Sequence, residues 1–585
     1  MKRLPFAIKL KTLSVMLLLP FLLGTLPARA GGDPPLPQPL PPTGNCYDDN
    51  IFYGAVLPGD ETSPVLVFVH GLSGLAEDWW SANTSAGLND MYYQAYWAGY
   101  RTAFVNLNVD PNIPDCTVER RPADDMFDDG NVLTMQLNTI TAHYNVEKVD
   151  IIAHSKGGID SQAAIIWSEA WPMVRNVFTL GTPHQGSILV DQLWSPEGFW
   201  LSVLLGQRDQ ATFSLRTGFM QLFRQATDSS TLDDDIHYYS GAGNYWQTPN
   251  TIFEVTGEWL QNNPEGGDND GVVTVDSTYL LDATSLFLEP WNHNQIYQGY
   301  NAFPFIQEIL TRPEITESKL YLPLLIRVTG PSNSVVQAKP RTSNTILRGG
   351  LISKSVTESI PIESQATHVH FSFITTDPAL TGVLVSPTGQ EYRLMVERQM
   401  DQTVFKGGFL LEQTIDHPQP GQWVFRLDSA TEAAYFLIVA LDSPLEVGLS
   451  GFTNRPVEPG KFLQLAAQAT DGSEIESVTF QTILNTPLVN RNTFAGSVLN
   501  YAFSQEGIYG VSVQVNGITS DGTPFERTFI VSQAVIQASK SADRLNLLDF
   551  LANQIFVGMM PNFERGGSVH PPPLSKFGFP PRQLR

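Results

Sequence analysis

Hydrophobic and polar residues follow two different patterns along the chain, and the change falls near residue 312. Before it, short runs of consecutive apolar residues alternate with longer amphipathic stretches. Strands that are apolar at every position belong in a parallel sheet that helices cover on both faces. The first half of the chain is therefore predicted to be an α/β domain. Its predicted strands are 65–69, 102–107, 149–153, 174–180 and 251–256, and its predicted helices are 79–97, 126–144 and 159–171.

After residue 312 the helical periodicity stops, and short apolar runs are separated by turns rich in Pro and Gly. From about residue 445 a second set of such runs begins, in which Tyr509, Val511, Val513 and Val515 alternate with small or polar residues. An alternation with period two is typical of strands with one buried face. The spacing of the runs fits two β-sandwiches. The first set of predicted strands is 369–373, 382–385, 423–427 and 435–441.

The predicted fold class is therefore multidomain, with a mostly parallel sheet flanked by helices and then two all-β sandwich domains. The predicted segments are a signal at 1–30, a Pro-rich linker at 31–45, the α/β domain at 46–312, a linker at 313–350, sandwiches at 351–444 and 445–535, and a tail at 536–585.

The composition is typical of several folded domains, and the net charge argues against nucleic acid as a partner. The chain has 585 residues, 42% of them hydrophobic, which is too long for one core and too apolar for a disordered chain. Its formal net charge is −24, from 35 basic and 59 acidic side chains. Nucleic-acid binding relies on clustered Lys and Arg, and an acidic chain is repelled by anionic membrane surfaces. Nucleic acid is therefore not expected as a partner.

The first 30 residues have the features of a secretory signal. Basic residues such as Lys2 and Arg3 precede the apolar run 16–23, and Ala28-Arg29-Ala30 supplies a cleavage site. The run is too short to span a bilayer, and no later stretch is long enough. A secreted protein without a transmembrane segment is expected. Cys46 and Cys116 both follow the signal, so we expect them to pair in an oxidising compartment.

Ser155 lies where the predicted strand 149–153 turns sharply into an apolar helix, in His154-Ser155-Lys156-Gly157-Gly158. Such a turn exposes the hydroxyl and places the next backbone N–H, that of Lys156, at the positive end of the helix. An oxyanion can bind there. An ordinary Ser in a helix cap is the alternative, but the position within an alternating sheet favours a nucleophile.

A second loop of this kind, His70-Gly71-Leu72-Ser73-Gly74, follows the strand 65–69 directly. In a hydrolase, a loop after an early strand supplies the second oxyanion N–H, for which Leu72 is the candidate. We expect His70 to brace the loop rather than to transfer protons. Taken alone, the loop is an ordinary Gly turn; together with Ser155, the oxyanion interpretation is favoured.

A nucleophilic Ser needs a base and an acid, which follow it in the order acid, then His. His184 is too close to Ser155 to follow an acid loop, and His237 precedes the acidic turn at 268–273. His293 remains as the base. Asp270 in the acidic turn is the candidate acid, with Asp268 as its nearest rival.

These motifs resemble those of secreted bacterial lipases and esterases of the α/β-hydrolase superfamily, over about residues 50–310. The resemblance implies that Ser155 is the nucleophile, His293 the base and Asp270 the acid, with Leu72 and Lys156 forming the oxyanion hole. Some related lipases bind calcium through an Asp two residues after the catalytic His, where this chain has Gln295. Calcium is therefore not supported, and no cofactor or metal is expected.

Two further features carry weaker hypotheses. The segment 188–223 is apolar, and Trp194, Phe199 and Trp200 are predicted to bind substrate within a cap; core packing is the alternative. His368 and His370 share one face of a strand, but a third metal ligand is absent, so exposed strand histidines are expected. The sandwiches resemble Ig-like or pre-peptidase accessory modules, suited to attachment or spacing.

The sequence thus predicts a secreted carboxylic-ester hydrolase that acts on lipid or polyester, at an interface or on an insoluble polymer. An acyltransferase or an amidase with the same triad is an alternative, because the triad alone does not select the acceptor. An adhesion protein, in which the sandwiches carry the function, is a further alternative from a different class.

Overall fold

An eight-stranded sheet organises the first half of the chain, in the order β1-β2-β4-β3-β5-β6-β7-β8. The computed structural model describes residues 33–555 except 82–85, 110–123, 196–197, 199–208, 229, 249–250, 264–266, 312–340, 397, 400–407, 454, 470–474, 486–490, 497–498, 542–546, 548–549 and 552. The predicted signal at 1–30 lies outside this part. Pairing is parallel from β4 through β8 and antiparallel where β1 and β2 extend the sheet. The strands are β1 Gln38–Pro39, β2 Ile51–Tyr53, β3 Val65–Val69, β4 Arg101–Val105, β5 Val149–His154, β6 Val174–Leu180, β7 His237–Gly243 and β8 Thr284–Glu289.

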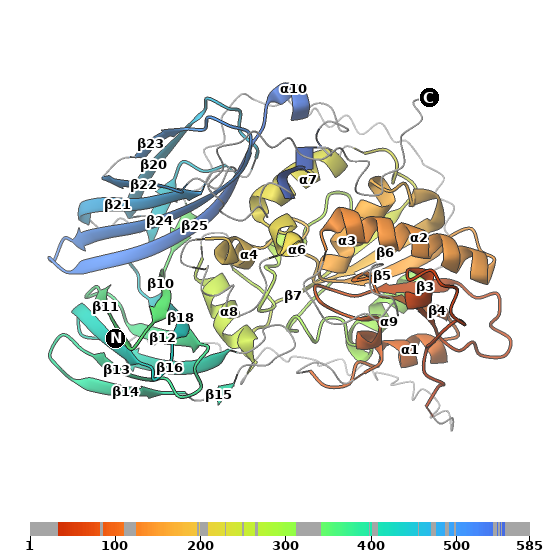
Figure 1. The fold of residues 1–585 in the computed structure, drawn as a ribbon, viewed down its shortest axis with the longest axis horizontal. Helices are drawn as coiled ribbons and strands as arrows, with labels where there is room; N and C mark the ends of the chain where they lie inside the picture. Colours follow the sequence, from red (N-terminus) through yellow and green to blue (C-terminus); the bar gives the residue numbers. More distant parts are fainter. Residues whose placement is uncertain are drawn as a thin grey trace, which may run out of the picture. The chain divides into compact units, whose positions relative to one another are not determined.

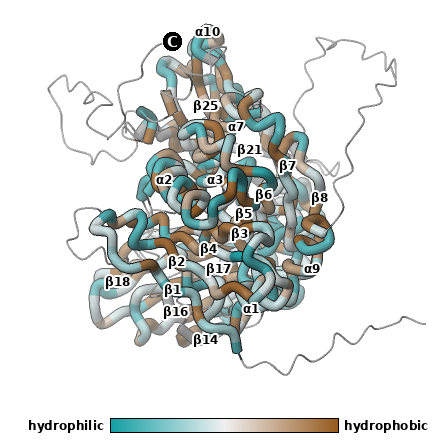
Figure 2. The backbone as a smooth tube through the Cα atoms, turned by 90° about the vertical axis from the view of Figure 1, so that its right-hand side faces the viewer, coloured by the Kyte–Doolittle hydropathy of each residue, from teal (hydrophilic) through white to brown (hydrophobic). Residues whose placement is uncertain are grey.

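Helices cover both faces of this sheet because its central strands are apolar on both sides. Val65, Val67 and Val69 of β3 pack in a cluster with residues of α2 (Met126–Tyr144) and α3 (Lys156–Ile166). Leu66 and Phe68 point to the opposite face, against α1 (Met91–Trp97) and α9 (Gly299–Leu310). Figure 1 shows the two helical layers, and Figure 2 shows hydrophobic positions gathered around β3 and β5. This three-layer arrangement is the predicted α/β architecture.

Among the described residues, four helices follow the carboxyl ends of β6 and β7, at the edge of the sheet where α/β proteins build their sites. After β6 come α4 (Ile188–Leu193), α6 (Gln210–Ser214) and α7 (Thr217–Thr227), and after β7 comes α8 (Ile252–Gln261). We refer to these as the cap helices. Their apolar residues form one buried cluster that includes Trp194, Phe219, Phe223 and Trp259.

Three sequence predictions in this domain need correction. The predicted strand 251–256 is the start of helix α8; its β-branched residues favour a strand locally, but Ile252, Phe253, Val255, Trp259 and Leu260 fall on one buried helical face. The predicted helix 79–97 is helical only from Met91, after a short 3-10 turn at Ala76–Trp79. The predicted helix 159–171 spans Lys156–Ile166, and residues 171–173 form a 3-10 turn.

The second half of the chain forms two β-sandwiches, each made of two antiparallel sheets. The first pairs the sheet β10-β18-β12-β16-β15 with β11-β17-β13-β14, and its core includes Phe371, Trp423 and Phe425. Its strands are β10 Thr345–Ile352, β11 Ser355–Ile362, β12 His368–Thr375, β13 Thr381–Val385, β14 Glu391–Met395, β15 Arg398–Gln399, β16 Phe409–Asp416, β17 Gly421–Asp428 and β18 Ala433–Asp442.

The second sandwich pairs β23-β20-β19-β9 with β22-β21-β24-β25. Tyr509, Val511, Val513 and Val515 of β24 all face its core, as their alternation predicts. With the α/β domain, the two sandwiches confirm the predicted fold class. The strands are β9 Arg341–Ser343, β19 Val447–Ser450, β20 Phe462–Ala469, β21 Ile475–Asn485, β22 Arg491–Gly496, β23 Leu499–Ala502, β24 Gly507–Thr519 and β25 Pro524–Val535.

Two segments predicted as a linker and a tail contain ordered structure. Strand β9 and the start of β10 occupy 341–350, at the end of the predicted linker. In the predicted tail, α10 spans Ala538–Ser541, and Leu547, Leu551 and Ile555 are buried in the cluster of the cap helices. No helix in the described ranges is long and apolar enough to cross a membrane.

The sandwiches pack directly on the cap helices. Ile508 and Ile530 of the second sandwich belong to the same apolar cluster as Phe219 and Phe223 of α7. The approach is close at Gly218, where an added Cβ would lie 2.5 Å from Oγ of Ser532. Helix α8 also contacts strand β18 of the first sandwich. The cap helices are therefore covered by the C-terminal half of the chain.

Candidate active site

Ser155 occupies a strained turn between β5 and α3. Its backbone angles, φ 52° and ψ −128°, lie in a region that non-glycine residues rarely adopt. Two glycines allow the turn to pack tightly: a Cβ on Gly157 would lie 2.3 Å from the carbonyl oxygen of His70, and one on Gly158 would lie 2.3 Å from Oγ1 of Thr182. The small residues noted in the sequence are thus required by close backbone approach.

The structure brings Ser155, His293 and Asp270 into one hydrogen-bonded chain. Oγ of Ser155 lies 3.0 Å from Nε2 of His293, and Nδ1 of His293 lies 2.7 Å from Oδ2 of Asp270. All three residues are buried, with exposed fractions of 8%, 4% and 1%. Ser155 follows β5, Asp270 lies in the loop after α8, and His293 lies between β8 and α9. The site is therefore assembled from loops far apart in the sequence.

Asp270 is fixed by its own turn, whereas Asp268 points elsewhere. The backbone N–H groups of Val272 and Val273 donate to Oδ1 of Asp270, at 3.0 and 2.7 Å, which leaves Oδ2 for His293. The N–H of His293 also donates to the carbonyl of Asp270. Asp268 is exposed. Of the two candidate acids, the geometry therefore selects Asp270.

Gly181 and His154 support His293, and the sequence prediction overlooked both. Gly181 has φ +63°, and a Cβ there would lie 3.1 Å from Oδ2 of Asp270 and 3.4 Å from Nδ1 of His293. Nε2 of His154 lies 3.0 Å from the carbonyl oxygen of His293, and its ring stacks on Tyr297. Burial, followed by the nearby His293, holds the pKa of His154 well below its usual range, so His154 is neutral and donates this bond.

The remaining candidate histidines lie outside this hydrogen-bonded chain. Nε2 of His184 is 3.1 Å from Oγ1 of Thr179, and burial lowers the pKa of His184 well below its usual range. His237 begins β7 and is exposed. Neither His184 nor His237 is the histidine that contacts Ser155, which agrees with the expectation from their positions in the sequence.

The loop His70–Gly74 packs against the turn at Ser155. A Cβ on Gly71 would lie 2.9 Å from Cβ of Ser155, so Leu72, the next residue, is adjacent to the nucleophile candidate. His70 braces the loop: its Nε2 accepts from the N–H of Leu107 at 3.0 Å, and its Nδ1 lies 2.8 Å from the carbonyl of Gly71. Gly71, the residue before Leu72, thus packs against Ser155, and the assignment of Leu72 and Lys156 as oxyanion donors stays a prediction.

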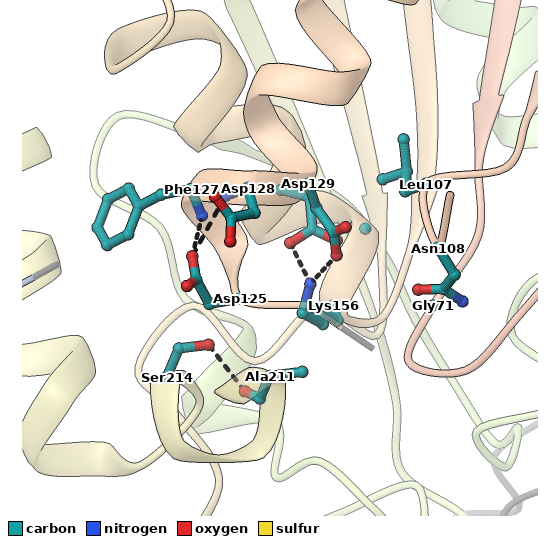
Figure 3. Close-up of polar contacts among 12 residues, drawn as sticks. Gly71, Leu107, Asn108, Asp125, Phe127, Asp128, Asp129, Lys156, Ala211 and Ser214 are labelled. Atoms are coloured by element: carbon teal, nitrogen blue, oxygen red, sulfur yellow. Dashed lines mark hydrogen bonds and ion pairs between the residues drawn. The ribbon is translucent and has the colours of Figure 1, made fainter. Parts of the chain in front are cut away.

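The side chain of Lys156 is buried beside this site, which the sequence prediction missed because it considered only the backbone N–H. Nζ of Lys156 donates to Asp129 at 2.5 Å and to Asp160 at 2.6 Å; Figure 3 shows Lys156 with Asp129. Burial alone would lower the pKa of Lys156, but the charges of Asp129 and Asp160 raise it above its usual value. Burial raises the pKa of Asp160 to about 6, against the opposing effect of Lys156.

Several predicted residues fall partly or wholly outside the described residues. Trp194 is buried in the cap cluster, with 7% of its surface exposed, but Phe199 and Trp200 lie outside the described part. Cys46 is described and packs at the edge of a core, whereas Cys116 is not described. The Cys46–Cys116 bond and the contribution of the two aromatic residues therefore stay predictions.

The metal hypotheses find no site in the described residues. No group of three or more His, Cys, Asp or Glu side chains among them is arranged to hold an ion. Gln295, which stands where some lipases have a calcium ligand, accepts a hydrogen bond from the N–H of Asn292 through Oε1. His368 is exposed as expected, but His370 is not: its Nδ1 lies 2.6 Å from Oε2 of Glu258 on α8.

Comparisons with known proteins agree with the fold. The family described as "PGAP1-like alpha/beta domain" matches residues 61–195, which include Ser155. No curated protein matches the sequence. The structure of the Bacillus licheniformis lipase BlEst2 in propeptide form is similar over 82% of this chain and 96% of that chain, with 27% identity and a TM-score of 0.63.

Two other solved structures match shorter parts of the chain. BlEst2 in mature form covers 45% of this chain and 98% of that chain, with 36% identity and a TM-score of 0.39. An esterase, RhEst1 from Rhodococcus, covers 48% of this chain and 98% of that chain, with 13% identity and a TM-score of 0.27. From its fold and its likeness to the lipase BlEst2 over most of its length, the chain is a hydrolase of the α/β-hydrolase type.

Proposed function

We propose that the protein is a secreted serine hydrolase that cleaves carboxylic esters, with Ser155 as nucleophile, His293 as base and Asp270 as acid. The observation that carries the proposal is the continuous pair of hydrogen-bond distances, 3.0 Å from Ser155 to His293 and 2.7 Å from His293 to Asp270. These are the separations that proton transfer between a nucleophile and its base requires. The strained turn at Ser155 supports the same role.

In the proposed mechanism, Ser155 attacks the ester carbonyl while Nε2 of His293 takes its proton. Asp270 keeps the proton of His293 on Nδ1, which leaves Nε2 free to act as the base, and its charge stabilises the imidazolium that forms. The backbone N–H groups of Leu72 and Lys156 stabilise the oxyanion. His293 then protonates the leaving alcohol, and water releases the acid from the acyl-enzyme in a second round of the same steps.

The apolar cap helices support a substrate with a hydrocarbon chain. Trp194, Phe219 and Trp259 belong to one buried cluster that covers the carboxyl ends of the strands. BlEst2, a relative that matches over most of this chain, is a lipase. We therefore propose lipid or polyester substrates, with neither a cofactor nor a metal in the reaction.

We also propose that the two sandwiches restrain the cap. The structure of BlEst2 that is similar over most of this chain is that of its propeptide form. Here, β25 contacts α4 and α7, and β18 contacts α8. Each of these helices lies in the cap, so separation of the sandwiches would free the cap to move. The proposal favours regulation by the C-terminal half over surface adhesion.

The test of the proposed function compares the wild type with Ser155→Ala on p-nitrophenyl esters of graded chain length and on emulsified triglyceride. We expect the variant to lose at least about 10,000-fold in kcat on every ester that the wild type cleaves. Equal activity in both proteins would overturn the triad, and no activity in either would favour a binding protein. Added alcohol acceptors and p-nitroanilides test the acyltransferase and amidase alternatives.

A separate test addresses the sandwiches. A protease site is introduced within residues 313–340 of the otherwise unchanged protein, so that the folded protein can be cut there. Activity on long-chain esters is expected to rise after the cut, with a smaller change on short-chain esters, which need less movement of the cap. An unchanged ratio of long-chain to short-chain activity would show that the sandwiches do not restrain the cap.

A further inference from the structure

The buried ammonium group of Lys156, the residue after the proposed nucleophile Ser155, links helices α2 and α3. Asp129, its first partner, lies in the first turn of α2, and Asp160, its second, lies one turn further along α3. Only 1% of Lys156 is exposed, and the side chains of Asp129 and Asp160 are equally enclosed. Figure 3 shows the ammonium group of Lys156 beside the carboxylate of Asp129. The side chain is therefore held at both ends, by its own backbone and by two carboxylates.

Two general rules disfavour a lysine at this position. Residue 156 is the first of α3, where the helix dipole is positive and a cation is unfavourable. Burial of a charge is costly, and an apolar side chain of similar length would pack there more cheaply. Residues that break local rules in this way are expected at functional positions, where another gain offsets the cost.

The charge of Lys156 acts on more groups than its two partners. It lowers the pKa of each of five aspartates, while burial raises all of them. These residues are Asp125, Asp128, Asp129, Asp160 and Asp209. Without the ammonium, Asp129 and Asp160 would be buried without a counter-charge near the start of α3, where the reaction must stabilise an oxyanion.

We propose that the side chain of Lys156 is a positioning residue for the oxyanion site. Its bonds to Asp129 and Asp160 fix the orientation of its own backbone N–H, and its charge offsets the surrounding carboxylates. The inference rests on the proposed ester hydrolysis, because it assigns a task to the side chain only if the N–H of Lys156 binds the oxyanion. It differs from the proposed function in naming the side chain, which touches neither substrate nor Ser155.

The first variant is Lys156→Met, which keeps a long unbranched side chain and removes the charge and the donors. The probes are p-nitrophenyl butyrate and a trifluoromethyl ketone of the same chain length, whose adduct with serine carries the oxyanion. We expect kcat to fall about 10- to 100-fold, less than the loss on removing a whole oxyanion donor, and KM to stay within twofold. The ketone should bind more weakly by the factor by which kcat/KM falls.

The matched control is Arg175→Met. Arg175 pairs with Asp150, which is fully buried in β5, at the end of the strand remote from Ser155. Arg175→Met removes the cation from Asp150, a buried carboxylate on the strand that leads to Ser155. It should therefore lower the Tm and leave kcat and ketone binding within twofold. Asp160→Asn, which keeps an oxygen acceptor for Nζ, should retain most of kcat.

Each outcome either supports or overturns the proposal. If Lys156→Met lowers the Tm as Arg175→Met does but leaves kcat and ketone binding unchanged, Lys156 is an ordinary structural ion pair. If KM changes as much as kcat, the side chain acts on substrate binding. Should Lys156→Met fail to fold, Asp129→Leu replaces it, because it removes both the charge and the acceptor for Nζ, and an unchanged kcat in that variant overturns the proposal.

The variant Ser155→Ala tests the proposed function separately from the role of the Lys156 side chain. If the wild type hydrolyses the ester and Ser155→Ala does not, the proposed function stands whatever Lys156→Met does. If Ser155→Ala is as active as the wild type, both proposals fail together. Full activity in Lys156→Met with an inactive Ser155→Ala removes the positioning role alone.

Discussion

The α/β domain and the sandwiches both bury charged side chains, but they arrange them differently. In the α/β domain, Asp270 and His293 form a chain of hydrogen bonds that ends at the hydroxyl of Ser155. In the sandwiches, the guanidinium of Arg527 meets both oxygens of Glu363, and neither residue is exposed. The remaining donors of Arg527 bond to Asn344 and to the carbonyls of Leu445 and Glu526.

This difference separates reactive from structural burial of charge. The hydrogen-bonded series from Asp270 through His293 ends at the hydroxyl of Ser155, whose oxygen can still form a new bond. Every donor of Arg527 is already hydrogen-bonded, so the pair with Glu363 has no group available for a reaction. The sandwich pairs instead join elements: Arg527 of β25 to Glu363 just after β11, and Arg348 of β10 to Glu526 of β25. Variants in each region should therefore change different measurements, activity in one and stability in the other.

The largest expected effect is on activity, in Asp270→Asn. The amide removes the charge that stabilises protonated His293 and can hold the wrong tautomer, so kcat should fall about 10,000-fold with little change in Tm. Steady-state ester hydrolysis measures the loss. Asp268→Asn is the matched control, because Asp268 is exposed in the same turn, and it should stay within twofold. Similar losses in both variants would contradict the choice of Asp270.

The next effect is on stability, in Arg527→Met. This change leaves Glu363 buried without its counter-charge, so the free energy of unfolding should fall by about 3–5 kcal/mol while kcat below the Tm stays unchanged. Replacing both residues, as Arg527→Met with Glu363→Leu, should recover most of the loss. A fall in kcat at temperatures where the variant is folded would show that this pair also serves the active site.

The pH dependence of the same pair follows from Glu363. Burial would raise its pKa, but Arg527 lowers the pKa below its usual value. A carboxyl with a lowered pKa in the folded state contributes its stabilisation above its unfolded pKa, about 4.3, and loses it as the pH falls through the folded value. The difference in Tm between the wild type and Arg527→Met should therefore shrink below about pH 4.

The smallest effect concerns the contact between the two regions, in His370→Gln. Burial lowers the pKa of His370, but the hydrogen bond to Glu258 and the charges of Glu258, Glu412 and Glu254 raise it overall. A raised pKa gives stabilisation that is full below the unfolded pKa, about 6.5, and is lost as the pH rises through the folded value. The variant should lose about 1 kcal/mol at pH 6 and less at pH 9.

Calorimetric unfolding at the two pH values measures this difference. His368→Gln is the control, since His368 lies two residues away on the same strand and is half exposed. It should change the Tm little at either pH. A loss in His370→Gln that is independent of pH would mean that the His370 contact contributes through packing and not through charge.

Parts of the fold with a local cause were predictable from the sequence. Strands 65–69 and 174–180 and the helix 126–144 have the predicted bounds, because a short run rich in apolar residues or a long amphipathic repeat favours one arrangement. The turn at Ser155 was also predictable, because small residues must follow a nucleophile at a tight strand-to-helix junction. The assignment of α8 failed because β-branched residues favour a strand, and only packing against the cap revealed its buried helical face.

By itself, the sequence determined which residues are candidates for the site, since the order of Ser155, Asp270 and His293 and the glycines beside them are properties of the chain. Tertiary structure decided which of them meet: it selected Asp270 over Asp268, placed His154 behind His293, buried Lys156 between Asp129 and Asp160, and brought His370 to Glu258. The physical reason is that hydrogen bonds and ion pairs act over a few ångströms, whereas these partners are separated by up to 139 positions along the chain.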